Sequence, residues 1–426
     1  MSETETEIEA AKAAAAVEAI ATGYEGTLSE QVQLYFRRIR SGEMGMLPAL
    51  AGTLVLGTLF SSLNEYFLTD KNIANLLTQT AALMILAIAL TFLLIMAEID
   101  LSAGITGGVG MAIFIRLVND QHWNWVLALV VALLGGVVIG AFIGFFVAKI
   151  GVPSFVVSLA LFLAFQGLML VMLGDAGSYR VQTPQVSAIM NKNMPTWAGW
   201  LMFVVVCLIA LGTSFYDRLR RQKYQMPVRP ISMLWLRFGA TVIGVGLLVA
   251  FLNQDRSTGI FPISGVPIVV PFALAILWLG QLMLDRTRFG LHIYAVGGNP
   301  EGARRAGINV TRVRISAFII CSVLAVVSGL FTISQVGVVQ SATGRDIVLS
   351  GVGAAVIGGV SLFGGRGRLM QATVGAFLIT MITNGLGLLG YSAGVTFLVT
   401  GGVLLLAATI DALTRKRSGS TSLART

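Results

Sequence analysis

The stretch Asp285–Arg314, DRTRFGLHIYAVGGNPEGARRAGINVTRVR, separates two long apolar segments and is rich in arginine. Its arginines are Arg286, Arg288, Arg304, Arg305, Arg312 and Arg314. Because an arginine side chain is costly to bury in lipid, such a stretch belongs in water beside a membrane. Gly297, Gly298, Asn299 and Pro300 indicate a turn near its middle.

A short helix is predicted from Pro300 to Ala306. Asn299 is suited to cap it, Pro300 fits the first helical position, and Glu301 lies in the first turn, where a carboxylate complements the helix dipole. Gly307 then ends the helix. A capped basic helix between membrane spans is suited to docking a cytoplasmic partner. A cytoplasmic loop that only follows the positive-inside rule would carry the same charge, so both interpretations stay open on the residues alone.

Composition indicates a membrane protein. Of the 426 residues, 56% are hydrophobic and 12% are charged, and the mean hydropathy is +0.83. A soluble domain usually has about twice that charged fraction. The net charge of +9 does not indicate nucleic-acid binding, because Arg and Lys cluster at the ends of apolar segments, where they set topology. We therefore predict an all-α polytopic bundle embedded in membrane lipid.

About twelve apolar segments have spanning length. They cover residues 47–67, 74–97, 101–118, 125–148, 154–173, 197–215, 232–252, 266–284, 315–335, 348–363, 369–388 and 394–412. The segments 101–118 and 348–363 are short or rich in glycine. An even count puts every strongly basic loop on one face, Asp217–Pro230 among them, and so predicts that both termini are cytoplasmic in a cell-membrane protein.

The membrane domain is expected to cover residues 46–413. Residues 1–45 begin acidic and alanine-rich, and they lack the basic start and apolar core of a cleaved signal peptide. We expect them to form a cytoplasmic extension, which the basic LYFRRIR at Leu34–Arg40 keeps inside. Residues 414–426 are expected to form a cytoplasmic tail.

Three stretches carry a family resemblance. FGLHIYAVGGNPEGARRAGI, within Asp285–Arg314, resembles the cytoplasmic coupling segment of the permease subunits of bacterial ABC importers for monosaccharides. GVPSFVVSLALFLAFQG at Gly151–Gly167 and AAVIGGVSLFGGRG at Ala354–Gly367 are similar to further elements of that family. The resemblance covers about Leu47–Leu413. It implies a homodimer that works with a cytoplasmic ATP-binding subunit and an extracytoplasmic sugar-binding protein. The residues that it implies for ATPase coupling are Asn299, Pro300, Glu301, Ala303, Arg304, Arg305, Ala306 and Gly307.

Residues 197–215 and 232–252 look like an extra hairpin joined by a basic loop. The shorter ribose-type permeases lack such a pair, whereas the xylose-type permeases resemble this longer plan. The resemblance therefore favours a pentose such as xylose. A packing addition that never touches sugar would produce the same pattern.

MAEIDLSAGITGG, at Met96–Gly108, places two carboxylates in the apolar zone. It resembles the family's GGIDLSVG signature, departing from it at Glu98 and keeping Asp100 and Ser102. Asp100 and Ser102 are accordingly predicted to shape the translocation path. The alternative is that Glu98 and Asp100 lie at a helix interface and cap a helix beginning at Leu101.

A second stretch, Ile347–Ser350 followed by glycines, is similar to Ile99–Ser102 followed by glycines. In the twelve-span count the two run in opposite directions, as an inverted repeat requires. Chance similarity between glycine-rich helices is the alternative. If the repeat is real, the path runs where the two elements face each other, and Ser350 and Asn384 are candidates to line it. The amide of Asn384 would serve equally well to bond a neighbouring helix.

No motif for chemistry is found. The sequence contains no G-x-x-x-x-G-K-[ST] phosphate loop and no Cys/His metal pattern, so we expect a transporter subunit without a cofactor or a metal, and not an enzyme. Cys207 and Cys321 lie in apolar runs, and His122 and His292 are expected in loops. The alternative functions are an ion-coupled secondary transporter, which should carry paired ionisable residues near the middle of its spans, and a membrane scaffold.

Overall fold

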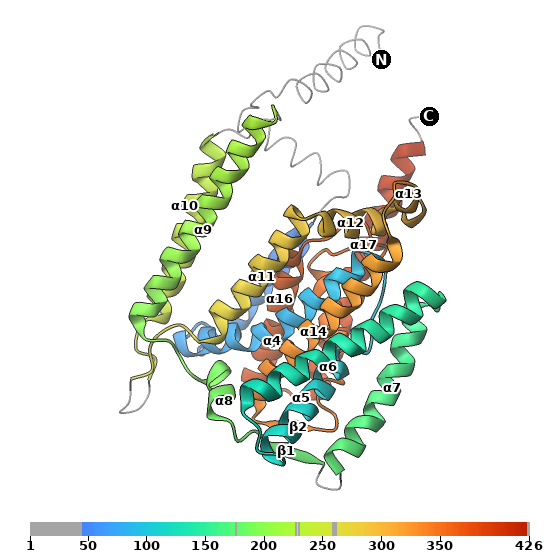
Figure 1. Cartoon of the computed structure of the whole chain (residues 1–426). Coiled ribbons are helices and arrows are strands. Elements are labelled where there is room, and N and C mark those ends of the chain that lie inside the picture. The colour runs from blue at the N-terminus through green and yellow to red at the C-terminus, as the bar shows by residue number, and fades with distance from the viewer. Residues whose placement is uncertain (1–44, 175–176, 226–227, 229–230, 258–261, 424–426) are drawn as a thin grey trace. The chain divides into compact units, whose positions relative to one another are not determined.

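The computed structural model describes residues 45–174, 177–225, 228, 231–257 and 262–423, so the predicted extension at 1–45 lies outside the described residues except for Gly45. Helices dominate the described part (Figure 1), which confirms the all-α class. The chain divides into two compact units. Among the described residues, the hairpin unit covers those of Met194–Val266, and the main unit covers the rest.

The main unit is a helical bundle with one small pair of strands. Its helices are α3 Leu47–Leu63, α4 Asp70–Leu94, α5 Ala103–Asn119, α6 Trp125–Phe145, the π-helical turn η1 Phe146–Ile150, α7 Ser154–Leu173, α8 Pro184–Asn191, α11 Val269–Arg286, α12 Arg288–Gly298, α13 Pro300–Arg305, α14 Val310–Val336, α15 Ile347–Ile357, α16 Leu369–Leu388 and α17 Ala393–Leu423. The strands β1 Ser178–Arg180 and β2 Val338–Gln340 pair antiparallel, with Tyr179 opposite Val339.

Helices α4 and α14 form the centre of the main unit. Helix α14 lies against α4, α5 and α6, and Ser328 on α14 donates a 2.8 Å hydrogen bond to the carbonyl oxygen of Ala82 on α4. Every residue from Thr80 to Met96 is buried. A helix that is apolar around its whole circumference is expected to be enclosed by other helices, and α4 is. The outer helices α6 and α7 instead expose apolar side chains such as Val138 and Val171, which suits contact with lipid.

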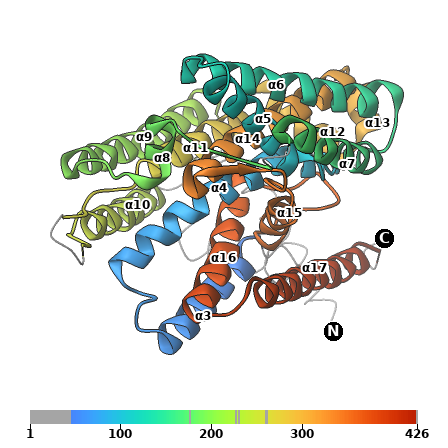
Figure 2. The ribbon, with the colours of Figure 1, turned by 90° about the horizontal axis from the view of Figure 1, so that it is seen from below.

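Glycines bring α6 against α14. Gly136, Gly140 and Gly144 recur every four residues on one face of α6, and Figure 2 shows α6 next to α14. A Cβ atom on Gly140 would lie 2.5 Å from the Cα of Ile319, and one on Gly144 would lie 2.7 Å from the Cα of Ile315. Lipid supplies no hydrophobic drive for helix association, so close backbone approach through small residues provides the packing energy instead.

Each of the twelve predicted segments corresponds to a helix, but not all are full spans. Eight helices in the described part are long and apolar enough to cross a membrane. The segment predicted at 348–363 corresponds to α15, which has 11 residues and is about 16 Å long, so the helix alone does not reach across a bilayer core of about 30 Å. Helix α15 ends at Ile357 because the chain turns at Gly358 and Gly359, and the φ of Gly359 is +101°. Twelve full crossings are therefore not confirmed.

The short helices α5 and α15 begin beside each other and lead away in opposite directions. A Cβ atom on Gly104 in α5 would overlap the carbonyl oxygen of Gly344, just before α15. Helix α5 leads to Asn119, whose side chain donates a 3.0 Å hydrogen bond to the carbonyl oxygen of Arg180 in β1. The chain after α15 leads to Gly364, which contacts α12. Since β1 and α12 lie at opposite ends of the main unit (Figure 1), this arrangement is what an inverted repeat requires.

The hairpin unit consists of α9 Thr196–Lys223 and α10 Ile231–Leu252, which pack against each other. The predicted loop Asp217–Pro230 begins later than expected, because α9 continues to Lys223. At the other end of the hairpin, the buried guanidinium group of Arg256 donates hydrogen bonds of 2.6 Å to the carbonyl oxygen of Leu252 and 2.8 Å to that of Gly265. The carbonyl oxygen of Leu252, at the end of α10, thus accepts from both Arg256 and the N–H of Gly265.

We predict that Gly140→Leu destabilises the protein and that Gly167→Leu does not. Leucine at 140 would force α6 away from α14, and overpacking of this kind costs about 1–3 kcal/mol. Gly167 on α7 is the matched control, because an added Cβ there has no atom within 4 Å. The midpoint of thermal unfolding in detergent should fall for Gly140→Leu only. An equal fall for both variants would contradict the packing argument.

Candidate coupling site

Three consecutive helices, α12, α13 and α14, begin within the Asp285–Arg314 stretch, and each has a side chain that caps its first turn. Thr287 caps α12 by accepting a 3.2 Å hydrogen bond from the backbone N–H of Gly290. Asn299 caps α13 by accepting a 2.8 Å bond from Gly302, and Asn309 caps α14 by accepting a 3.0 Å bond from Arg312. Each cap satisfies an N–H group that the first turn of a helix leaves unpaired, so the local sequence defines where each helix begins.

Helix α13 forms nearly as the sequence predicts. Pro300 is at its first position, and the helix ends at Arg305, one residue before the predicted end. Gly307 has a φ of +83°, and the N–H of Ile308 donates a 3.0 Å hydrogen bond to the carbonyl oxygen of Ala303. The N–H of Gly307 donates to Arg304 at 3.0 Å, which completes a Schellman motif.

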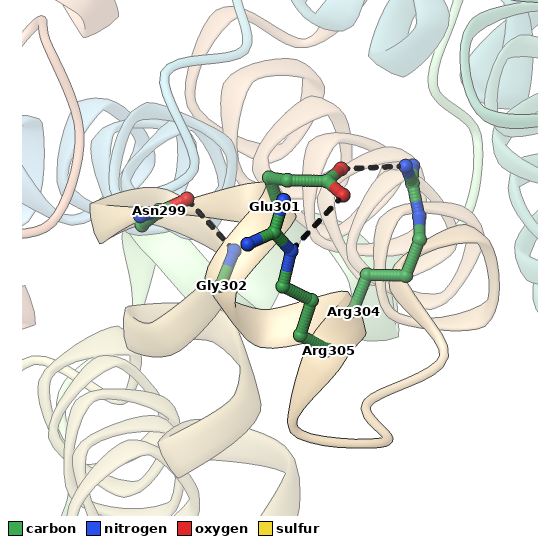
Figure 3. A network of polar contacts seen from close by, with 5 residues as sticks. All are labelled: Asn299, Glu301, Gly302, Arg304 and Arg305. Carbon is green, nitrogen blue, oxygen red and sulfur yellow. Dashed lines mark hydrogen bonds and ion pairs between the residues drawn. The ribbon is translucent and has the colours of Figure 1, made fainter.

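The polar side chains of α13 point outward together (Figure 3). Glu301 accepts a 2.9 Å hydrogen bond from Arg304 and lies 3.6 Å from the Nε of Arg305. The side chain of Glu301 is 57% exposed and that of Arg305 is 81% exposed, so these pairs contribute little to stability. Ala303, in contrast, is buried against the bundle and is not available to a partner. The exposed surface of α13 is therefore a small charged knob on a rigidly capped helix.

Helix α12 was not predicted from the sequence. Of the four predicted turn residues, Gly297 and Gly298 lie in the last turn of α12, and Asn299 joins α12 to α13. His292 lies within α12 and not in a loop. The signals that predict α12 are the cap residue Thr287 and the spacing of Gly290, Ile293 and Val296, which are all buried.

Gly297 is required for a close backbone contact. A Cβ atom on Gly297 would overlap the carbonyl oxygen of Ile95, at the end of α4. The same oxygen accepts a 2.7 Å hydrogen bond from the N–H of Gly365. Gly364 lies so close that its added Cβ would be 2.7 Å from the carbonyl oxygen of Gly297 and 3.0 Å from the N atom of Ala97. Backbone from three distant parts of the chain thus meets at the residues 95–100, which we call the α4–α5 turn.

The stretch Gly151–Gly167, which also resembles the family, forms hydrogen bonds with the same turn. The Oγ atom of Ser154 accepts a 3.2 Å hydrogen bond from the N–H of Ile99, and Ser158 donates a 3.4 Å bond to the carbonyl oxygen of Ile99. Glu98 forms an ion pair with Arg314 near the start of α14, with 3.0 Å between Oε1 and Nε. The Nε–H of Arg314 does not point at that oxygen, so the contact is an ion pair and not a hydrogen bond. All three stretches that resemble the family therefore converge on the α4–α5 turn.

The alternative prediction that Glu98 and Asp100 cap a helix beginning at Leu101 is wrong about where the helix begins. Helix α5 begins at Ala103, because Asp100 folds the preceding residues into a turn. Its Oδ1 atom accepts hydrogen bonds from the N–H of Ser102 at 2.8 Å and from the Oγ of Ser102 at 2.6 Å. Both residues are fully buried, and the Oδ2 atom of Asp100 has no hydrogen-bond partner among the described residues. Glu98 does lie at an interface, as the alternative interpretation expected.

The predicted path residues are not gathered around one cavity. A cavity of ≈ 10 Å³ lies where α5 meets the segment before α15. It is lined by Leu86, Gly104, Gly108, Ala325, Ser328, Gly329, Thr332, Thr343, Gly344 and Ile347. Ligand pockets usually measure about 300–1,000 Å³, so this position is closed to a sugar.

Asn384 has a packing partner on another helix. It exchanges hydrogen bonds of 2.9 and 3.0 Å with Asn72 on α4, and it donates a 3.4 Å bond to Gln79. Ser350 lies on α15, half-buried. Among the described residues, no three His, Cys, Asp or Glu side chains lie together as metal ligands would.

Tyr294 attaches α12 to the segment before α16. Its hydroxyl group donates a 2.6 Å hydrogen bond to the carbonyl oxygen of Gly367. Burial raises the pKa of Tyr294 to about 12, Asp285 adds to the rise and Arg368 opposes it. The hydroxyl group therefore stays protonated near neutral pH and remains a donor.

The chain belongs to the family described as branched-chain amino acid transport system / permease component, which it matches over residues 72–408. It is therefore a multi-pass membrane permease. The xylose transport system permease protein XylH of Escherichia coli (strain K12) is 32% identical over 388 residues, which cover 90% of this chain and 95% of that protein. XylH of Haemophilus influenzae is 30% identical over 385 residues, 89% of this chain and 99% of that protein. The ribose import permease protein RbsC of E. coli (strain K12) is 29% identical over 377 residues, 88% of this chain and 96% of that protein. No solved structure matches the chain significantly.

We predict that Asn299→Ala loosens the start of α13 and that Asn299→Asp does not. Alanine removes the acceptor for the N–H of Gly302, and loss of such a cap costs about 0.5–2 kcal/mol. Hydrogen exchange of the Gly302 and Ala303 amides should become about 2- to 30-fold faster, since 1.4 kcal/mol corresponds to a factor of ten. Aspartate keeps an acceptor at the same position, so its exchange rates should match those of the wild type. Unchanged exchange in Asn299→Ala would contradict the capping role.

Proposed function

We propose that this chain is the membrane-spanning permease subunit of an ATP-driven importer for a monosaccharide, with xylose as the first candidate. The observation that carries this proposal is the alignment with the xylose permease along 95% of the length of that protein. The family's description names branched-chain amino acids, whereas the relatives reported above are named for xylose and ribose. A neutral sugar needs hydrogen-bonding partners and no fixed charge, which suits the scarcity of ionisable residues in the apolar helices.

Helix α13 is the proposed docking element for the ATP-binding subunit. It lies between α11 and α14, two of the helices long enough to cross a membrane. Its exposed Glu301, Arg304 and Arg305 form a charged knob of fixed geometry, which is suited to insertion into a cleft of a soluble partner. In the proposed topology this end of the bundle is cytoplasmic, as are both termini, because the strongly basic segments then lie on the inner face.

The remaining parts of the importer follow from this role. Two copies of the chain form the pathway, and a sugar-binding protein delivers xylose at the opposite end of the bundle. The translocation path passes where α5 meets the segment before α15, and the closed cavity at Gly104 and Gly344 is its constriction. Movement of α5 away from Gly344 would open it. The relatives are named as permeases of transport systems, which favours this multi-subunit importer over a single-chain ion-coupled carrier.

The test is ATP-dependent xylose uptake into proteoliposomes that contain the permease, its ATP-binding subunit and xylose-loaded binding protein. Gly307→Val should abolish uptake and lower the affinity for the ATP-binding subunit about tenfold or more, since left-handed backbone costs a β-branched residue about 1–2 kcal/mol and the knob would be misplaced. Gly307→Asn is the control, because asparagine tolerates this conformation.

Two results would contradict the proposal. One is xylose uptake that continues without ATP when only the membrane potential is held. The other is full ATP-driven uptake in the Gly307→Val variant, which would show that the end of α13 has no role in docking.

A further inference from the structure

We propose that the α4–α5 turn transmits movement of α12 and α13 to α5, and that the Glu98–Arg314 ion pair and the Gly297 contact are its two attachments. The inference rests on the proposed function, because it concerns how docking at α13 reaches the constriction. It assigns positioning roles to Glu98, Arg314 and Gly297.

The first attachment is rigid because it is made by backbone. Gly297 touches the carbonyl oxygen of Ile95 with no side chain between them, and Gly364 packs on Gly297 and Ala97. A displacement of α12 cannot be absorbed here by a change of rotamer. We therefore expect α12 and the α4–α5 turn to move together, because close-packed interfaces switch between discrete arrangements and do not deform continuously.

The second attachment joins the turn to α14. Glu98 has a side chain that is 10% exposed, and that of Arg314 is 26% exposed, so their charges interact in an environment with a lower dielectric constant than water. Arg314 lies five residues after Asn309, the cap between α13 and α14. Removing either charge leaves the other partly buried and uncompensated, which is costly. The ion pair therefore holds the α4–α5 turn against the start of α14, which directly follows the docking helix α13.

The turn is also poised to move α5. Ala97 has a φ of +58°, a backbone conformation that residues other than glycine seldom adopt, so the surrounding contacts must hold it there. Asp100 then binds Ser102, the residue that immediately precedes α5. Gly104 and Gly108, in the first two turns of α5, contact the backbone of Gly344 and Thr343 and close the cavity. A displacement of the α4–α5 turn would thus first separate Gly104 and Gly108 from the backbone of Gly344 and Thr343.

The experiment measures xylose uptake per ATP hydrolysed in the same proteoliposomes, together with co-purification of the ATP-binding subunit. Glu98→Gln and Arg314→Gln should each bind the ATP-binding subunit as the wild type does, yet lower uptake per ATP about tenfold, within the range of typical coupling energies. The double variant Glu98→Arg with Arg314→Glu should restore most of that uptake, because it rebuilds the pair with reversed charges. Such rescue would show that the pairing of the two charges, and not either side chain alone, supports the coupling.

A matched pair of glycine variants tests the other attachment. Gly297→Ala should also uncouple ATP turnover from uptake, whereas Gly298→Ala should behave like the wild type, because an added Cβ there has no atom within 4 Å. Intact binding of the ATP-binding subunit with unchanged uptake per ATP in both ion-pair variants would overturn this inference and leave the proposed function standing. Failure of the wild-type permease to bind the ATP-binding subunit would overturn the proposed function, and this inference with it.

Discussion

The contact between Gly297 and the carbonyl oxygen of Ile95 is the constraint on which the arrangement of the coupling site depends. Any larger residue at 297 would separate α12 from the end of α4, and the hydrogen bond from Gly365 to the same oxygen would be disturbed. Around this contact, the α4–α5 turn is also bound by Ser154 and Ser158 of α7 and by Arg314 of α14. A segment of few residues thus determines how α12 and α13 are held against the bundle.

The same physical principle recurs deeper in the main unit. Lipid does not drive apolar helices together, so the closest contacts are made where glycine allows backbone to touch backbone. Gly140 brings α6 onto α14, and Gly104 brings α5 onto the segment before α15. The second contact closes a cavity that α4, α5 and α14 line, which measures ≈ 10 Å³. Tight glycine contacts therefore serve both to stabilise the bundle and to close it.

Local chemistry explains what could be predicted from the sequence. The helix positions follow from apolar length, and α13 follows from Asn299, Pro300 and Gly307, because caps act over a few residues. The length of α15, the buried turn at Asp100 and the packing of Asn384 on Asn72 could not be predicted, since each depends on contacts between residues far apart in the chain. Gly297 shows the limit most clearly: its sequence context indicates a turn, while its function is set by Ile95, about 200 residues away.

The most direct test of the account is a cryo-electron microscopy structure of the permease bound to its ATP-binding subunit, with and without ATP. Glu301 and Arg305 should contact the ATP-binding subunit, Gly297 should stay against Ile95 in both states, and Gly104 should separate from Gly344 in one of them. A complex in which α13 faces away from the ATP-binding subunit, or in which Gly297 leaves Ile95 while α5 stays in place, would contradict the account.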